Sequence, residues 1–157
     1  MARKSGIIGG IIGFVLALIA EIPIYQNFVI SLKIYSYNST GFYIWGIVLS
    51  NDEGFGLLSL NFPENLIALT FWVILIFISL SSIFASPKKS IPNNSLKLYN
   101  LNILFTAILL IIYGIQIIIT NLSNIGAIFF NIGIGYYLLA LILVLNMIVK
   151  SKLKKGE

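Results

Sequence analysis

Four long apolar stretches constrain this chain more than any other feature. They cover residues 6–30, 66–85, 98–120 and 126–149, and only Glu21 and Pro23 interrupt the first. An α-helix of about 20 largely apolar residues crosses a hydrocarbon core of about 30 Å. Since the first stretch is also longer than the apolar core of a cleaved signal peptide, we expect it to be retained. The sequence predicts an all-α integral membrane protein, a single polytopic domain with four transmembrane helices in one bundle.

Composition excludes most catalytic chemistry. The chain is 59% apolar and 10% charged, and it contains neither cysteine nor histidine. Disulfides, thiolate and imidazole metal ligands and the commonest acid–base catalyst are therefore absent. The remaining acids do not pair as catalytic carboxylates, since Asp52 and Glu53 lie in a turn-like "SNDEG" segment. We expect a protein that is not an enzyme and has no cofactor and no metal site.

The cationic residues indicate how the chain is oriented. All but one flank the same ends of the apolar stretches: Arg3, Lys4, Lys88, Lys89, Lys97, Lys150, Lys152, Lys154 and Lys155. Only Lys33 lies in the opposite set of loops. The positive-inside rule then predicts a cell-membrane protein with both termini, a loop at 86–97 and a tail at 150–157 in the cytoplasm. Because these charges mark span ends, the expected partner is the lipid bilayer and not nucleic acid.

Small residues mark the helix faces that we expect to pack together. Gly9, Gly13 and Ala17 repeat every four residues in the first stretch, and Gly6 and Gly10 form a second pair beside them. Helices associate closely in lipid through such small residues. In the fourth stretch, Gly135 shares a face with Ala127 and Asn131. We predict Gly9, Gly13, Ala17 and Gly135 as helix-packing positions.

Polar residues within the spans predict a second inward-facing surface. On the third stretch one stripe carries Tyr99, Asn102, Thr106, Tyr113, Gln116 and Thr120. Counting from the cytoplasmic ends at about 1.5 Å per residue places four polar residues of different spans at a similar height, about 24–29 Å up. These are Glu21, Thr70, Gln116 and Asn131, which we call the predicted polar layer. One interpretation is a proton- or cation-responsive site, and the other is interfacial placement of Glu21 with amides that serve packing.

The segment 31–62 is longer than a simple connection needs. Usual helix–helix links run about 2–8 residues. Three runs, 31–37, 42–49 and 55–60, suit strands, and "NSTG" and "NDEG" between them suit turns. We predict an external three-stranded antiparallel β-element between the first two helices. Its Tyr35, Tyr37 and Trp45 are candidates for contact with the membrane interface or with another protein.

Two sequons fall on the predicted outer side of the membrane. They begin at Asn38, in Asn-Ser-Thr, and at Asn121, in Asn-Leu-Ser. This sequence pattern is the acceptor for N-glycosylation, although chance matches are common in a chain so rich in asparagine. Asn38 and Asn121 are therefore candidate glycosylation sites.

The predicted topology resembles that of a known family of membrane proteins. Four spans with both termini inside, a β-rich first external loop and a Gly-x-x-x-Trp in it, "GFYIW" at 41–45, resemble the claudin and peripheral-myelin-protein-like tetraspan membrane proteins. The fourth span, "GIGYYLLALILVLNMIV", also looks like the last span of that group. The signature cysteines of the family are absent from this chain. The resemblance implies that Trp45 anchors the external loop on the helix ends.

Three functions follow as hypotheses. The first is a claudin-like organiser, or an adhesion or scaffold protein, that presents the external β-loop to further copies of the chain or to other membrane proteins. The second is an accessory subunit of a larger membrane complex. The third is a small transporter or proton-linked channel that uses Glu21.

Overall fold

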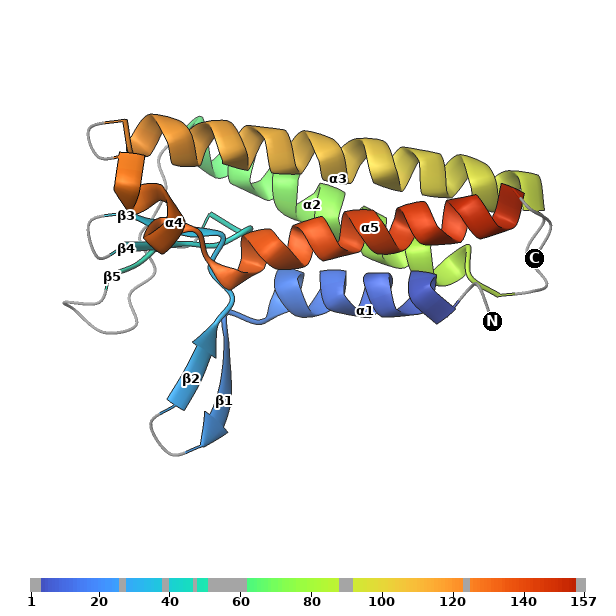
Figure 1. Cartoon of the computed structure of the whole chain (residues 1–157), viewed down its shortest axis with the longest axis horizontal. Helices are drawn as coiled ribbons and strands as arrows, with labels where there is room; N and C mark the ends of the chain where they lie inside the picture. Colours follow the sequence, from blue (N-terminus) through green and yellow to red (C-terminus); the bar gives the residue numbers. More distant parts are fainter. Residues whose placement is uncertain are drawn as a thin grey trace.

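Four helices lie side by side and form a bundle. The computed structural model describes residues 4–25, 28–37, 40–46, 48–50, 62–87, 92–122 and 125–154. The bundle consists of α1 (Lys4–Leu18), α2 (Glu64–Phe84), α3 (Pro92–Thr120) and α5 (Ile134–Lys154), in contact around a ring in the order α1–α2–α3–α5 (Figure 1). The helices α1 and α3 begin at the end of the bundle where α2 and α5 finish. We call this the lysine end and the opposite one the sheet end.

Three of these helices are long and apolar enough to cross a membrane. They are α2, α3 and α5, whose outward faces carry exposed Ile, Leu, Val and Phe side chains. The fourth, α1, is an apolar helix of 15 residues. At about 1.5 Å per residue it is only about 22 Å long. The predicted cytoplasmic loop at 86–97 is shorter than expected, because α3 already begins at Pro92.

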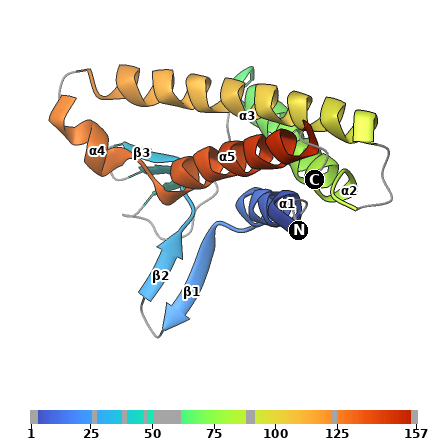
Figure 2. The ribbon, with the colours of Figure 1, turned by 45° about the vertical axis from the view of Figure 1, so that its right-hand side comes forward.

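The predicted first span, 6–30, is wrong beyond Leu18. Its second half forms an antiparallel hairpin of β1 (Glu21–Tyr25) and β2 (Phe28–Ser31), in which Ile22 pairs with Ile30. Pro23 explains this result, because proline lacks an N–H and clashes with the preceding helical turn. The β-branched residues on both sides favour strands. Figure 2 shows that the hairpin projects away from the bundle.

A second sheet lies over the sheet end of the bundle. It contains β3 (Tyr35–Tyr37), β4 (Thr40–Phe42) and β5 (Val48–Ser50), all antiparallel and in sequence order. The described residues thus form two small sheets, where the sequence predicted one. The predicted strand at 42–49 is divided by a turn in which the Gly46 N–H donates to the Tyr43 carbonyl over 3.0 Å. Gly46 has a φ of 74°, which glycine adopts without strain. The predicted strand at 55–60 lies outside the described residues.

The predicted fourth span, 126–149, is also interrupted. The chain forms a 3₁₀ turn, η1 (Ile125–Ala127), then the short helix α4 (Ile128–Asn131), and enters α5 only at Ile134. The break lies where the segment between β2 and β3 crosses the chain. The N–H groups of Gly133 and Gly135 donate to the carbonyls of Ile34 and Lys33, each over 2.8 Å.

Buried polar side chains connect α2, α3 and α5 inside the bundle. The Ser81 hydroxyl donates to Asn102 Oδ1 over 2.6 Å, Asn102 Nδ2 donates to Ser82 Oγ over 3.0 Å, and Ser82 Oγ donates to Asn146 Oδ1 over 2.9 Å. Each of these side chains is buried. Hydrogen bonds of this kind hold helices together where water is absent. As the stripe on α3 predicts, Tyr99, Asn102, Thr106 and Tyr113 are buried, whereas Gln116 is exposed.

The small residues of α1 lie on its two buried faces. Gly10 and Gly13 face α2, and the nearest side chain to Gly9 is Leu145 of α5. Gly6 lies against Tyr99 of α3 and Ser86, just beyond α2. A Cβ atom on Gly10 would lie 2.7 Å from the Ser79 carbonyl oxygen. Since a backbone atom cannot rotate away as a side chain can, this contact requires glycine.

We expect Gly10→Val to push α1 away from α2 and to lower the free energy of unfolding by about 1–3 kcal/mol, the usual cost of overpacking. Thermal unfolding in mild detergent, followed by size-exclusion chromatography, measures the change. Ile11→Phe is the matched control, because it adds volume on the exposed face of the same helix. Equal stability of the two variants would contradict the close approach of α1 to α2.

Candidate functional site

The sheet end is organised around the last turn of α1. A helix leaves carbonyl groups in its final turn without helical partners. The Trp45 indole N–H donates to the Leu16 carbonyl over 3.2 Å, and the Trp72 indole N–H donates to the Ala17 carbonyl over 2.9 Å. Trp45 comes from the turn after β4, and Trp72 from α2. These two bonds join the end of α1 to the second sheet and to α2.

Further backbone contacts fix both sheets to the bundle. The Leu32 N–H donates to the Ala20 carbonyl over 2.7 Å, which closes the base of the β1–β2 hairpin. Ile132 forms an isolated antiparallel bridge with Tyr35. A Cβ atom on Gly135 would lie 2.9 Å from the Lys33 carbonyl oxygen. Glycine therefore allows the strand segment to cross the start of α5 at close range.

The hairpin base and the second sheet also share a polar contact. Ser31 Oγ and the Tyr43 hydroxyl lie 2.7 Å apart and form a hydrogen bond. Burial raises the pKa of Tyr43 above its usual value; the bond to Ser31 opposes this shift, and the negative charge of Glu21 adds to it. Tyr43 therefore stays a neutral hydrogen-bonding group throughout the physiological pH range.

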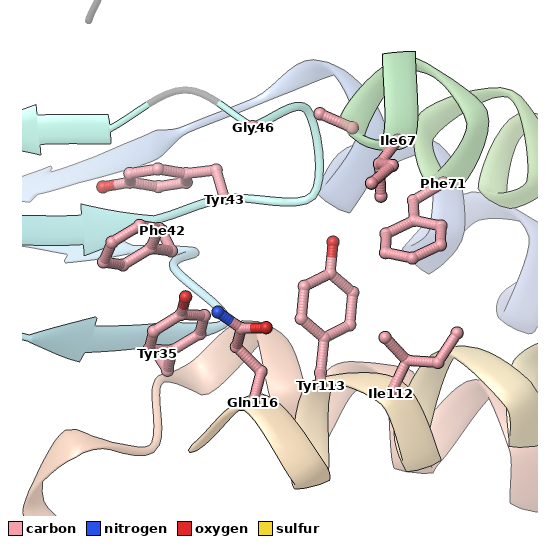
Figure 3. A pocket seen from close by; sticks show the side chains of 10 residues that line it. Tyr35, Phe42, Tyr43, Gly46, Ile67, Phe71, Ile112, Tyr113 and Gln116 are labelled. Carbon is pink, nitrogen blue, oxygen red and sulfur yellow. The ribbon is translucent and has the colours of Figure 1, made fainter. Parts of the chain in front are cut away.

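A cavity of about 350 Å³ lies between the second sheet and the helices α2 and α3. Its lining residues are Tyr35, Phe42, Tyr43, Gly46, Ile67, Ala68, Phe71, Ile112, Tyr113 and Gln116 (Figure 3). The ring of Tyr35 stacks on Phe42, with 4.4 Å between centroids, and Phe71 meets Tyr113 edge to face. The wall is thus mainly aromatic and aliphatic.

Two polar groups of this cavity pair with one another. The Gln116 side chain, from the last turns of α3, hydrogen-bonds to the Tyr35 hydroxyl. Burial raises the pKa of Tyr35 above its usual value, and this hydrogen bond opposes the shift. Tyr35 is accordingly a neutral phenol at the wall of the cavity.

The four residues of the predicted polar layer have separate surroundings. Glu21 does not lie on α1, since it is the first residue of β1 and pairs with Ser31. Thr70 bonds to the Leu66 carbonyl of its own helix over 2.8 Å. Asn131 bonds to Asn121, and Gln116 to Tyr35. The hydrogen bonds of these side chains in the described residues therefore do not join the four into one site.

The other predicted residues also have definite positions. Tyr35 is buried, and Tyr37, two residues further along β3, is 40% exposed. Gly9, Gly13 and Ala17 are buried in the bundle, whereas Gly135 lies against the segment 32–34 instead of another helix.

The structure describes only one of the two predicted glycosylation sites. Asn38 lies outside the described residues. The side chain of Asn121 is buried, and its Nδ2 donates to the Ile117 carbonyl over 2.8 Å. A glycan on that nitrogen would require this hydrogen bond to break.

Sequence reasoning missed the roles of Trp72 and Tyr113 at this end of the bundle. No local pattern distinguishes Trp72, because an aromatic residue in an apolar span is typical both of a lipid-facing position and of a core position. Tyr113 belongs to the polar stripe that predicts the inward face of α3, but such a stripe does not predict a cavity. Among the described residues no group of three or more Asp, Glu, His or Cys side chains gathers that could hold a metal ion.

Comparisons of the chain with protein-family models, with curated proteins and with solved structures find no match.

Trp72→Phe keeps the ring but removes the N–H that pairs with the Ala17 carbonyl. We expect a loss of about 1–3 kcal/mol in the free energy of unfolding, the usual cost of an unsatisfied buried polar group. Thermal unfolding in detergent measures it. Tyr137→Phe is the control, since it also removes one polar group from an aromatic side chain, at a position that is 57% exposed. If the two variants unfold at the same temperature, the Trp72 bond does not stabilise the end of α1.

Proposed function

We propose that this protein is a non-enzymatic membrane protein of four crossing helices that presents an outer β-assembly to neighbouring proteins. The outer β-assembly consists of β1 to β5 with residues 132–135. The observation that carries the proposal is the β1–β2 hairpin, which projects from a fixed base and exposes apolar side chains.

The distribution of charge supports a membrane orientation with both termini in the cytoplasm. The described lysines Lys4, Lys97, Lys150, Lys152 and Lys154 belong to helix segments at the lysine end, and Lys33 belongs to the sheet end. Lysine flanks of this kind remain on the cytoplasmic side. The short helix α1 begins at the lysine end and contacts α2 and α5, which supports its crossing with them. The bilayer can thin locally around a short span at modest cost.

The way in which the hairpin is fixed to the bundle supports a role in contact with other proteins. Ile22 and Ile30 at its base pack against the core of the bundle. Further along the hairpin, Ile24 is 55% exposed and Val29 is 43% exposed. A surface that is already ordered loses less entropy on binding than a flexible loop does. Exposed apolar side chains on a fixed ribbon suit a second copy of the chain or another membrane protein.

The resemblance to claudin-like tetraspan proteins agrees with this proposal. Such an organiser would use the first external segment for lateral contacts within the membrane or with another cell surface. The Trp45 bond to the end of α1 is the kind of anchoring that the resemblance implies. An accessory subunit of a larger complex is the alternative, and it would use the same surface with a different partner.

Single-cysteine labelling tests the orientation, because the natural chain contains no cysteine. We expect Tyr37→Cys to react with a membrane-impermeant maleimide on intact cells, since this position lies in β3 at the sheet end. We expect Ser151→Cys, near the end of α5, to react only after permeabilisation. The reverse pattern would contradict the proposed orientation.

Photo-crosslinking in native membranes tests the contact surface. A photoreactive amino acid at Ile24 should give adducts of discrete mass with protein partners. The same residue at Ile111, an exposed position on α3, is the control and should label lipid. Adducts between two copies of the chain support the organiser, and adducts with unrelated subunits support the accessory role. Lipid labelling alone at both positions would contradict a contact function of the hairpin.

A further inference from the structure

A tyrosine hydroxyl that has no hydrogen-bond partner among the described residues opens into the cavity beside the second sheet. Tyr113 is only 8% exposed, and its hydroxyl points into the open space of the cavity (Figure 3). None of the hydrogen bonds in the described part of the chain involves this hydroxyl. It is not among the fully buried atoms, so it is open to the cavity. Polar groups in the walls of ligand cavities fix the orientation of what binds there, so this hydroxyl is available to a molecule that occupies the cavity.

The chemistry of the wall restricts what the ligand can be. The ten lining residues carry no formal charge, and their polar side-chain groups are the hydroxyls of Tyr35, Tyr43 and Tyr113 and the amide of Gln116. Burying a net charge here would carry a large desolvation cost without an opposite charge to offset it. The wall therefore suits a molecule that is mainly apolar, with an uncharged oxygen near Tyr113. The volume of about 350 Å³ lies within the range of ligand pockets, roughly 300–1,000 Å³.

The position of the cavity indicates where such a ligand comes from. Ile67 of α2 and Ile112 of α3 line it and are also 50% and 37% exposed. They belong to helix faces that carry further exposed apolar side chains, so the cavity borders the surface that lipid would cover. Tyr113 lies about 24 Å along α3 from Lys97, at about 1.5 Å per residue. In a hydrocarbon core of about 30 Å this depth lies just below the outer interface.

We propose that this cavity binds one acyl chain of an uncharged lipid, whose hydroxyl or ester oxygen accepts a hydrogen bond from Tyr113. The acyl chain contacts Ala68, Phe71 and Ile112. The assignment to the outer leaflet depends on the proposed orientation, whereas the binding itself does not. Its test is also independent of the contact function of the hairpin, because the variants lie on α2 and α3.

The test uses the purified full-length protein in phosphatidylcholine nanodiscs. The probe is a monoacylglycerol with a diazirine in its acyl chain. After irradiation, intact mass and peptide mapping should show saturable labelling by a single probe, on the segments 67–71 and 112–116. Ala68→Phe fills the cavity and should reduce this labelling several-fold. Leu69→Phe is the matched control, since Leu69 is 53% exposed and does not line the cavity. Equal labelling of both variants would overturn the proposal.

A second comparison tests the polar anchor. An alkane probe with the same diazirine chain lacks the oxygen that Tyr113 would bind. The natural chain should prefer the monoacylglycerol several-fold over the alkane, and Tyr113→Phe should abolish the preference while it keeps the alkane labelling. Tyr137→Phe should keep the preference. Should Ala68→Phe not fold, this comparison alone decides, and a preference retained in Tyr113→Phe would overturn the assignment.

Discussion

The last turn of α1 ends among apolar neighbours, and its carbonyl groups need donors there. Water can satisfy free carbonyls at the surface of a soluble protein, but a lipid environment offers no such donor. Here two indole N–H groups pair with the Leu16 and Ala17 carbonyls. One indole belongs to the turn after β4 and the other to α2. The position at which α1 ends therefore also determines where the second sheet lies on the bundle. The short first helix and the folded sheet end are thus two consequences of one constraint.

The same requirement explains why the fourth apolar stretch is broken. The segment after β2 passes over the start of α5, where its carbonyls need donors. The N–H groups of Gly133 and Gly135 provide them, and glycine at both positions allows the strand to approach. A continuous helix through residues 126–149 would have used these N–H groups internally. The sheet end therefore exchanges helical hydrogen bonds for bonds between segments that lie far apart in the sequence.

Structure that depends on local chemistry can be predicted from the sequence, whereas structure that depends on these bonds between distant segments cannot. The spans that became α2 and α3 follow from hydropathy, because local chemistry alone decides them, and inward residues such as Asn102 follow from helical periodicity. The end of α1 and the break before α5 depend on partners such as Trp72 and Lys33, which no local pattern identifies. Pro23 was visible as an interruption, but its meaning depended on the strand that pairs with it. The predicted polar layer rested on height along each span, and height does not determine which side chains face one another.

The polar side chains of the bundle fall into two groups with different consequences. Those between α2, α3 and α5, from Ser81 to Asn146, satisfy one another, and such a closed network serves the packing of the helices. At the sheet end, Gln116 pairs with Tyr35, but Tyr113 has no partner in the described residues. No fully buried polar side-chain atom in the described part of the chain lacks a partner, and the Tyr113 hydroxyl differs from the buried groups because it is open to the cavity. The hydroxyl of Tyr113 is thus available to a molecule in the cavity, whereas the closed network between the helices serves their packing.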